Sequence, residues 1–145
     1  MGSAAELCDA ERMLIGACLC GALRYEVEGP LQMLLHCHCS MCRKHHGAPF
    51  ATLAAVPAES LRWQSGEASL LEYPSPSARL RRFCGVCGSV APAPVSERAL
   101  VPVGNLVGDL EGVSGLHMFV ASKAPWHTIG DDLPQHQDAP PGWAP

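Results

Sequence analysis

The sequence predicts an all-β fold, a single small domain of short antiparallel strands held together by zinc. Its 145 residues suit one domain that can bury its own core. Its 14 glycines and 13 prolines divide the chain into short segments, which favours strands and turns over long helices. All but one of its 8 cysteines fall into three tight groups, a spacing typical of metal ligands rather than of disulfides.

The two ends are expected to lie outside the packed domain. Residues 1–11 are interpreted as a flexible leader in which Cys8 is a spare thiol, and residues 12–133 as the domain. Residues 134–145 form a Pro-rich tail that we expect to be poorly ordered. The acidic start lacks the features of an export signal, and no apolar run approaches the roughly 20 residues of a membrane span. We therefore expect a cytoplasmic protein that enters no membrane.

The first half of the domain contains strand-like segments separated by glycine and proline. In residues 23–28 apolar and charged side chains alternate, as in a strand with one buried face. Further strands are expected at residues 13–16, 31–36, 50–56 and 61–63. Residues 40–46 are predicted to form a short helical turn, with Ser40 as its N-cap and Gly47 after its end.

The second half continues the β pattern up to the tail. Strands are expected at residues 70–73, 78–83, 100–103, 116–121 and 126–129. Residues 91–94 are predicted to be an edge strand or a loop, because proline donates no hydrogen bond to a ladder. Residues 104–115 are interpreted as a Gly-rich bend. Trp126 is expected in the core, and His117 as a hydrogen-bonded strand residue rather than a metal ligand.

The first and third cysteine groups are expected to share one structural zinc ion. Cys18 and Cys20 form a C-x-C pair, and Cys84 and Cys87 form a C-x-x-C pair within a Gly-rich knuckle. Together the two pairs supply the four thiolates of a tetrahedral structural site. Because the pairs are distant in sequence, the ion would join an early loop to a late one. Its loss would cost the fold and not only an activity.

The middle group, Cys37, Cys39 and Cys42, supplies three thiolates in the pattern C-x-C-x-x-C and is one ligand short. Four histidines are close in sequence: His36, His38, His45 and His46. His45 or His46 can complete a second structural site of the Cys3His kind. Alternatively, water or substrate takes the fourth position, which is the arrangement of a catalytic zinc. The spacing alone leaves both alternatives open.

The motifs around these cysteines resemble those of the family of glutathione-dependent formaldehyde-activating enzymes, which also includes centromere protein V. The segments that carry the resemblance are residues 16–21, 37–44 with 47–49, 82–89 and 123–126. The resemblance implies a β fold like that of the Mss4-like zinc proteins. It also implies two zinc ions per chain, a structural one at the outer cysteine pairs and a catalytic one at the middle group.

The resemblance further implies a carbon–sulfur lyase. In the implied reaction the thiol of glutathione, the co-substrate, joins formaldehyde to give S-hydroxymethylglutathione. A zinc ion deprotonates a coordinating thiol at neutral pH and polarises an aldehyde oxygen. Three cysteinate ligands weaken that second effect, because they leave the site with a net negative charge.

Candidate substrate-binding residues are the cations that flank the cysteines. Glutathione carries two carboxylates, and guanidinium or ammonium groups pair with carboxylates. Arg43 and Lys44 lie beside the middle group, and Arg81 and Arg82 beside the knuckle, with Arg82 the favoured residue of this second pair. The remaining catalytic candidates, His45 and His46, are expected to transfer the proton between thiol and aldehyde oxygen.

Two classes of function remain after these arguments. The first is an enzyme acting on a small-molecule thiol and aldehyde, with formaldehyde or a related glutathione adduct as the substrate. The second is a non-catalytic zinc module that binds a protein partner. Nucleic acid is not an expected partner, because the net charge of -4 supplies no field that attracts phosphates.

Overall fold

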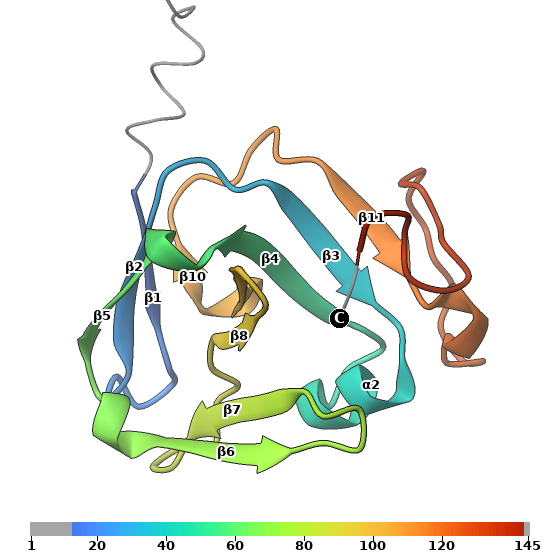
Figure 1. Cartoon of the computed structure of the whole chain (residues 1–145). Coiled ribbons are helices and arrows are strands. Elements are labelled where there is room, and N and C mark those ends of the chain that lie inside the picture. The colour runs from blue at the N-terminus through green and yellow to red at the C-terminus, as the bar shows by residue number, and fades with distance from the viewer. Residues whose placement is uncertain (1–12, 144–145) are drawn as a thin grey trace, which may run out of the picture.

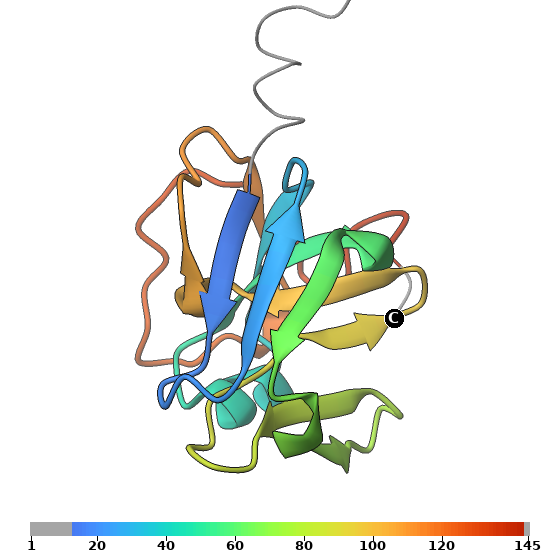
Figure 2. The same cartoon turned by 90° about the vertical axis from the view of Figure 1, so that its left-hand side faces the viewer.

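Strands in residues 13–143, which the computed structural model describes, form two larger sheets and a two-stranded ribbon (Figures 1 and 2). The predicted leader 1–11 and Cys8 lie outside the described residues. The all-β prediction is confirmed, since the single α-helix described is seven residues long. No helix in residues 13–143 is long and apolar enough to cross a membrane.

The four-stranded sheet has the order β10-β1-β2-β5 and is antiparallel throughout. Its strands are β1 (Met13–Ala17), β2 (Arg24–Glu28), β5 (Leu61–Ser65) and β10 (Leu106–Val107). The predicted alternation is confirmed in β2, where Tyr25 and Val27 are buried. Gly16 is required opposite Tyr25, because a Cβ there would lie 2.1 Å from the Tyr25 ring. Strand β10 was missed, since the sequence analysis read residues 104–115 as a bend.

The five-stranded sheet has the order β11-β3-β4-β9-β8. Its strands are β3 (Met33–Cys37), β4 (Ala51–Pro57), β8 (Ala93–Val95), β9 (Arg98–Pro102) and β11 (Gly115–Met118). The edge prediction holds for β8, which contains Pro94 and pairs only with β9. One pair departs from the predicted antiparallel arrangement, because β11 runs parallel to β3.

The ribbon and the helix lie together at one end of the molecule (Figures 1 and 2). The ribbon consists of β6 (Leu70–Pro74) and β7 (Leu80–Cys84), and the helix α2 spans Ser40–His46. Short 3-10 turns connect several strands: η1 (Ala58–Ser60), η2 (Glu67–Ser69), η3 (Val103–Asn105) and η4 (Val120–Ser122). Three of the grouped cysteines lie in named elements: Cys37 ends β3, Cys42 lies in α2, and Cys84 ends β7.

The caps of α2 differ in part from the prediction. The N-cap is Cys39 and not Ser40, because the Cys39 sulfur accepts a hydrogen bond of 3.3 Å from the backbone N–H of Cys42. Gly47 ends the helix as predicted, in a left-handed conformation with φ 60 and ψ 40. A cysteine that caps the helix is thereby fixed close to a second cysteine in its first turn.

The core has a part on each face of the five-stranded sheet. One cluster joins Leu14, Tyr25 and Val27 of the four-stranded sheet to residues of β4 and β9, so it fills the space between the two sheets. The other cluster joins β3, β4 and β11 and includes Cys37 and Cys42. The middle cysteine group is therefore anchored in packed apolar structure.

The chain after β11 corrects two predictions. Residues 126–129 form no strand, and Trp126, expected in the core, is 71% exposed. The tail was expected to be poorly ordered, but residues 134–138 pair with the end of β11 and the residue that follows it. Specifically, the backbone N–H groups of His117, Phe119 and His136 donate to carbonyl oxygens across this contact. The polar composition concealed this pairing, because backbone groups make it.

Candidate metal centre

The outer cysteines Cys18, Cys20, Cys84 and Cys87 come together as predicted. Their sulfur atoms lie within 4.8 Å of one another, and the Cys18 and Cys20 sulfurs are 3.5 Å apart. Cys18 follows β1 and Cys84 ends β7, so the group connects the four-stranded sheet to the ribbon. Four thiolates at this spacing fit a tetrahedral zinc ion.

Hydrogen-bond donors of the backbone and of Ser89 lie against sulfurs of this group. Backbone N–H groups of Leu23 and Val86 donate to the sulfurs of Cys18 and Cys84, at 3.2 Å and 3.4 Å. The pKa of Cys87 is lowered to about 5, first by the hydrogen bond of the Ser89 hydroxyl, which lies 3.2 Å from its sulfur. Donors aimed at sulfur are the arrangement expected of a zinc knuckle.

The middle cysteines Cys37, Cys39 and Cys42 form a second group, with their sulfurs also within 4.8 Å of one another. Cys37 ends β3 and is 3% exposed, whereas Cys42 lies inside α2 and is 0% exposed. Cys39, between them, is half-buried. Three sulfurs held in this way fit one zinc ion, and Cys39 is the most exposed of the three residues.

No histidine or carboxylate of residues 13–143 joins this group as a fourth ligand. The structure therefore does not support the Cys3His alternative. His45 and His46 lie at the end of α2 instead, and burial is the first cause that lowers the pKa of each. For His46 the pKa falls to about 4, so its imidazole is neutral at pH 7 and only a weak base.

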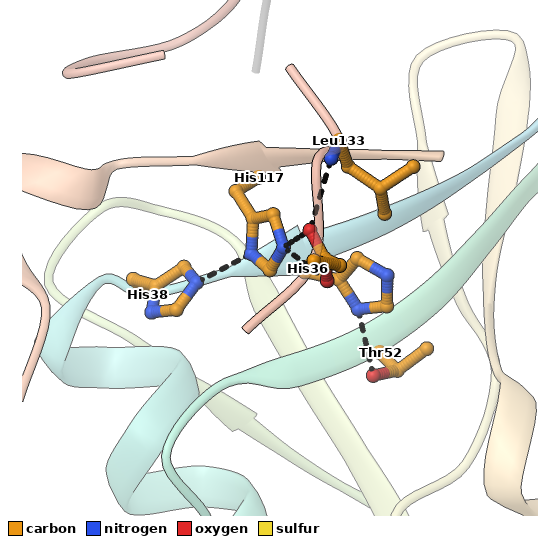
Figure 3. Close-up of polar contacts among 6 residues, drawn as sticks. His36, His38, Thr52, His117 and Leu133 are labelled. Atoms are coloured by element: carbon orange, nitrogen blue, oxygen red, sulfur yellow. Dashed lines mark hydrogen bonds and ion pairs between the residues drawn. The ribbon is translucent and has the colours of Figure 1, made fainter. Parts of the chain in front are cut away.

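Of the other two histidines, His38 belongs to a hydrogen-bonded network with His117 (Figure 3). His38 Nε2 lies 2.8 Å from His117 Nδ1, and His117 Nε2 lies 3.0 Å from the Asp131 carboxylate. Because a carboxylate only accepts, His117 Nε2 carries the proton and its Nδ1 accepts from His38. His36 is held separately, 3.1 Å from the Thr52 hydroxyl.

This network confirms His117 as a hydrogen-bonded strand residue and reveals a residue that sequence reasoning missed. Asp131 accepts from His117 and also from the backbone N–H of Leu133 at 3.0 Å. Nothing near Asp131 in the sequence marks it, since one acidic residue in a polar segment is ordinary. Only the pairing of the tail with β11 brings it to the histidines.

The candidate cations occupy different surroundings. Arg82 is already paired, with its Nε 2.8 Å from the Glu72 carboxylate across the ribbon. Arg81, on the opposite face of β7, is 8% exposed and donates to the Cys42 sulfur at 3.5 Å. Arg43 donates to the backbone carbonyl of His38 at 3.3 Å, and Lys44 is exposed. Arg82 is the residue that the sequence favours for substrate binding, but Arg81 is the one whose guanidinium contacts the three-cysteine group.

The enclosed space near this group is small. A cavity of about 30 Å³ is lined in part by His45, His46 and Arg81, which is room for little more than a water molecule. A larger cavity of about 380 Å³ lies elsewhere, against Leu116 and Trp143, and no cysteine lines it. A ligand the size of a tripeptide does not fit in that small cavity.

Comparison with known proteins points to one family. A crystal structure of a Rhodobacter sphaeroides protein is 30% identical to this chain, covering 70% of this chain and 98% of that one, with a TM-score of 0.56. No match was found among the curated proteins. The family described as glutathione-dependent formaldehyde-activating enzyme matches residues 13–121. The chain thus belongs to the family of glutathione-dependent formaldehyde-activating enzymes.

Proposed function

We propose that this protein is a zinc-dependent carbon–sulfur lyase that joins glutathione and formaldehyde to S-hydroxymethylglutathione, or acts on a related glutathione adduct. The observation that supports the proposal is that the seven grouped cysteine sulfurs divide unequally between two sites. Four of them close one site, whereas three form another to which residues 13–143 add no fourth ligand. Family membership supports the same assignment. The clustered thiols need a reducing compartment, which favours a cytoplasmic location.

The chemistry requires one bond to form and one proton to move. The sulfur of glutathione attacks the formaldehyde carbon, the carbon–oxygen π bond breaks, and the thiol proton ends on the oxygen. Zinc held by Cys37, Cys39 and Cys42 would supply an acidified thiol and a polarised carbonyl. His45 and His46, at the end of the helix that contains Cys42, are the candidates to accept the thiol proton, and the lowered pKa of each makes it a weak base for that step.

Binding of the tripeptide requires cations near the three-cysteine group that pair with its two carboxylates. We propose that Arg43 and Lys44, on the helix that contains Cys42, pair with the glutathione carboxylates. Arg82 has to exchange Glu72 for a substrate carboxylate before it can contribute. Because uncatalysed addition of thiols to formaldehyde is easy, the gain from the enzyme rests mainly on holding both reactants together.

The proposal is tested by exchange NMR of glutathione with formaldehyde, in the presence of the zinc-loaded protein. We expect faster exchange between free glutathione and its hydroxymethyl adduct than in protein-free buffer. The Cys39→Ser variant is the matched control and should give the buffer rate. If the wild-type protein neither accelerates exchange nor binds glutathione, the non-catalytic module for a protein partner becomes the better reading.

A further inference from the structure

Arg81 carries a positive charge into the interior without a carboxylate to balance it. The residue is 8% exposed, and its Nε atom is buried and lacks a hydrogen-bond partner. In residues 13–143 no Asp or Glu oxygen lies within ion-pair distance of its guanidinium. Burying an unpaired charge costs several kcal/mol. A negatively charged neighbour is therefore expected on physical grounds.

The neighbour that the structure offers is the three-cysteine group. Arg81 Nη1 donates to the Cys42 sulfur at 3.5 Å, and Cys42 is 0% exposed. Three cysteinates around a divalent ion leave one net negative charge, and one guanidinium cancels it. The buried charge of Arg81 and the excess charge of the sulfurs thus balance each other.

The four-cysteine group has no such partner. The hydrogen bonds to its sulfurs in the described chain come from backbone N–H groups, from Ser89 and from its own cysteines. Four cysteinates around a divalent ion leave two net negative charges, and water at the exposed Cys20 can solvate them. The two groups therefore differ in electrostatics as well as in ligand number.

We propose that Arg81 is the counter-ion of the three-cysteine group and that it allows this group to accept an anionic thiolate as its next ligand. Without that cation, the net negative charge of the group would repel a second anion. The inference rests on the proposed function, because it identifies the incoming ligand as the thiolate of the co-substrate. Arg81 is thus a positioning residue that acts through Cys42 and its metal.

Ligand binding to the cobalt-substituted protein tests this role without catalysis. Two probes are titrated at one fixed pH and followed by visible absorption: 2-mercaptoethanol, which binds as an anion, and imidazole, which binds neutral. The variant Arg81→Gln keeps a hydrogen-bond donor and removes the charge. Its matched control is Arg82→Gln on the other face of β7, where the partner is Glu72.

We expect Arg81→Gln to weaken the binding of 2-mercaptoethanol at least about tenfold. The attraction between a nearby unit charge and a bound anion exceeds the free energy that a tenfold change in affinity represents. Binding of imidazole should change less than about threefold, and Arg82→Gln should change neither affinity. Arg81→Lys keeps the charge and should hold the affinity for 2-mercaptoethanol within about threefold.

Several results would overturn the inference. Equal weakening of both probes would mean that Arg81 only supports the shape of the site, and an unchanged affinity for 2-mercaptoethanol would mean that its charge is irrelevant. If the wild-type protein binds neither probe, the three-cysteine group has no position open to a further ligand. If Arg81→Gln does not fold, a tenfold loss in Arg81→Lys contradicts the inference. Failure of the proposed reaction looks different: the wild-type protein then prefers the thiolate probe but leaves glutathione exchange unaccelerated.

Discussion

Two cysteines of the middle group are part of the hydrophobic core, and the third is its accessible member. Cys37 and Cys42 pack with Leu35, Leu53 and Met118, whereas Cys39 is half-buried and caps α2. Substitutions at these cysteines should therefore differ in their structural cost. Cys39 is the position at which the metal can be removed with the least disturbance of packing.

Cys39→Ser is expected to lower the zinc content from two ions per chain to one while the fold is retained. A serine hydroxyl is a favourable N-cap acceptor, so it can replace the sulfur in the hydrogen bond from Cys42. The cost of the cap should then stay within about 1 kcal/mol. Metal analysis and circular dichroism measure the two expectations. Loss of both ions would contradict the assignment of Cys39 to a separate site.

Among the elements, β11 connects the metal-binding end to the final segment of the chain. It runs parallel to β3, which delivers Cys37, and its His117 contacts both His38 and Asp131. The backbone of the tail pairs with the same strand end. The position of the tail should therefore depend on the charge of Asp131.

Asp131→Asn is expected to lower the melting temperature at neutral pH and to make no difference in acid. The pKa of Asp131 is lowered, first by the hydrogen bond from His117. A lowered carboxyl pKa adds stability above the ordinary value of 3.8, and this contribution is lost as the pH falls through the lower folded value. The measurement is the melting difference between wild type and variant from pH 7 to pH 2, because the folded pKa lies below 3.8.

Asp132→Asn is the matched control for that experiment. Asp132 is the next residue and is exposed, and its carboxylate accepts no hydrogen bond from the described side chains. It should leave the melting temperature unchanged at every pH. A melting difference for Asp131→Asn that persists or grows in acid would show that the carboxylate charge is not what secures the segment.

In the whole molecule, the four-cysteine group joins the four-stranded sheet to the ribbon beside a small core cluster that includes Leu23 and Ala91. Cys18 and Cys20 follow the first strand, and Cys84 and Cys87 follow the ribbon strand β7, so one ion connects the four-stranded sheet to the ribbon. Structural zinc contributes about 10–16 kcal/mol in small sites. That range is comparable to the 5–15 kcal/mol of net stability typical of a domain.

Cys84→Ser is expected to yield unfolded or aggregated protein, in contrast to Cys39→Ser. Its sulfur is 1% exposed and accepts a backbone hydrogen bond, so both zinc and packing are lost. Purification yield, metal content and thermal melting compare the two variants. Strong chelation of the wild-type protein should reproduce the Cys84→Ser result. If both serine variants melt alike, the division between a structural and an accessible site is wrong.

Much of the fold could be predicted because it depends on local pattern. The alternation in β2, the turn at Gly47 and the edge position of Pro94 each follow from a few neighbouring residues. The sorting of cysteines into four and three also followed from spacing, since close pairs share a metal more readily than a disulfide. The sequence also predicts a strand at residues 126–129, but the backbone of this segment pairs with no strand of the described chain.

The sequence by itself determined the two cysteine groups and the β architecture that carries them. Only the tertiary structure decided which of Arg81 and Arg82 faces the sulfurs, because adjacent strand residues point to opposite sides and sequence does not say which side is inner. It also decided that His117 meets Asp131 and that the tail follows β11. These contacts join segments distant in the chain or depend on backbone groups common to all residues, so no local pattern encodes them.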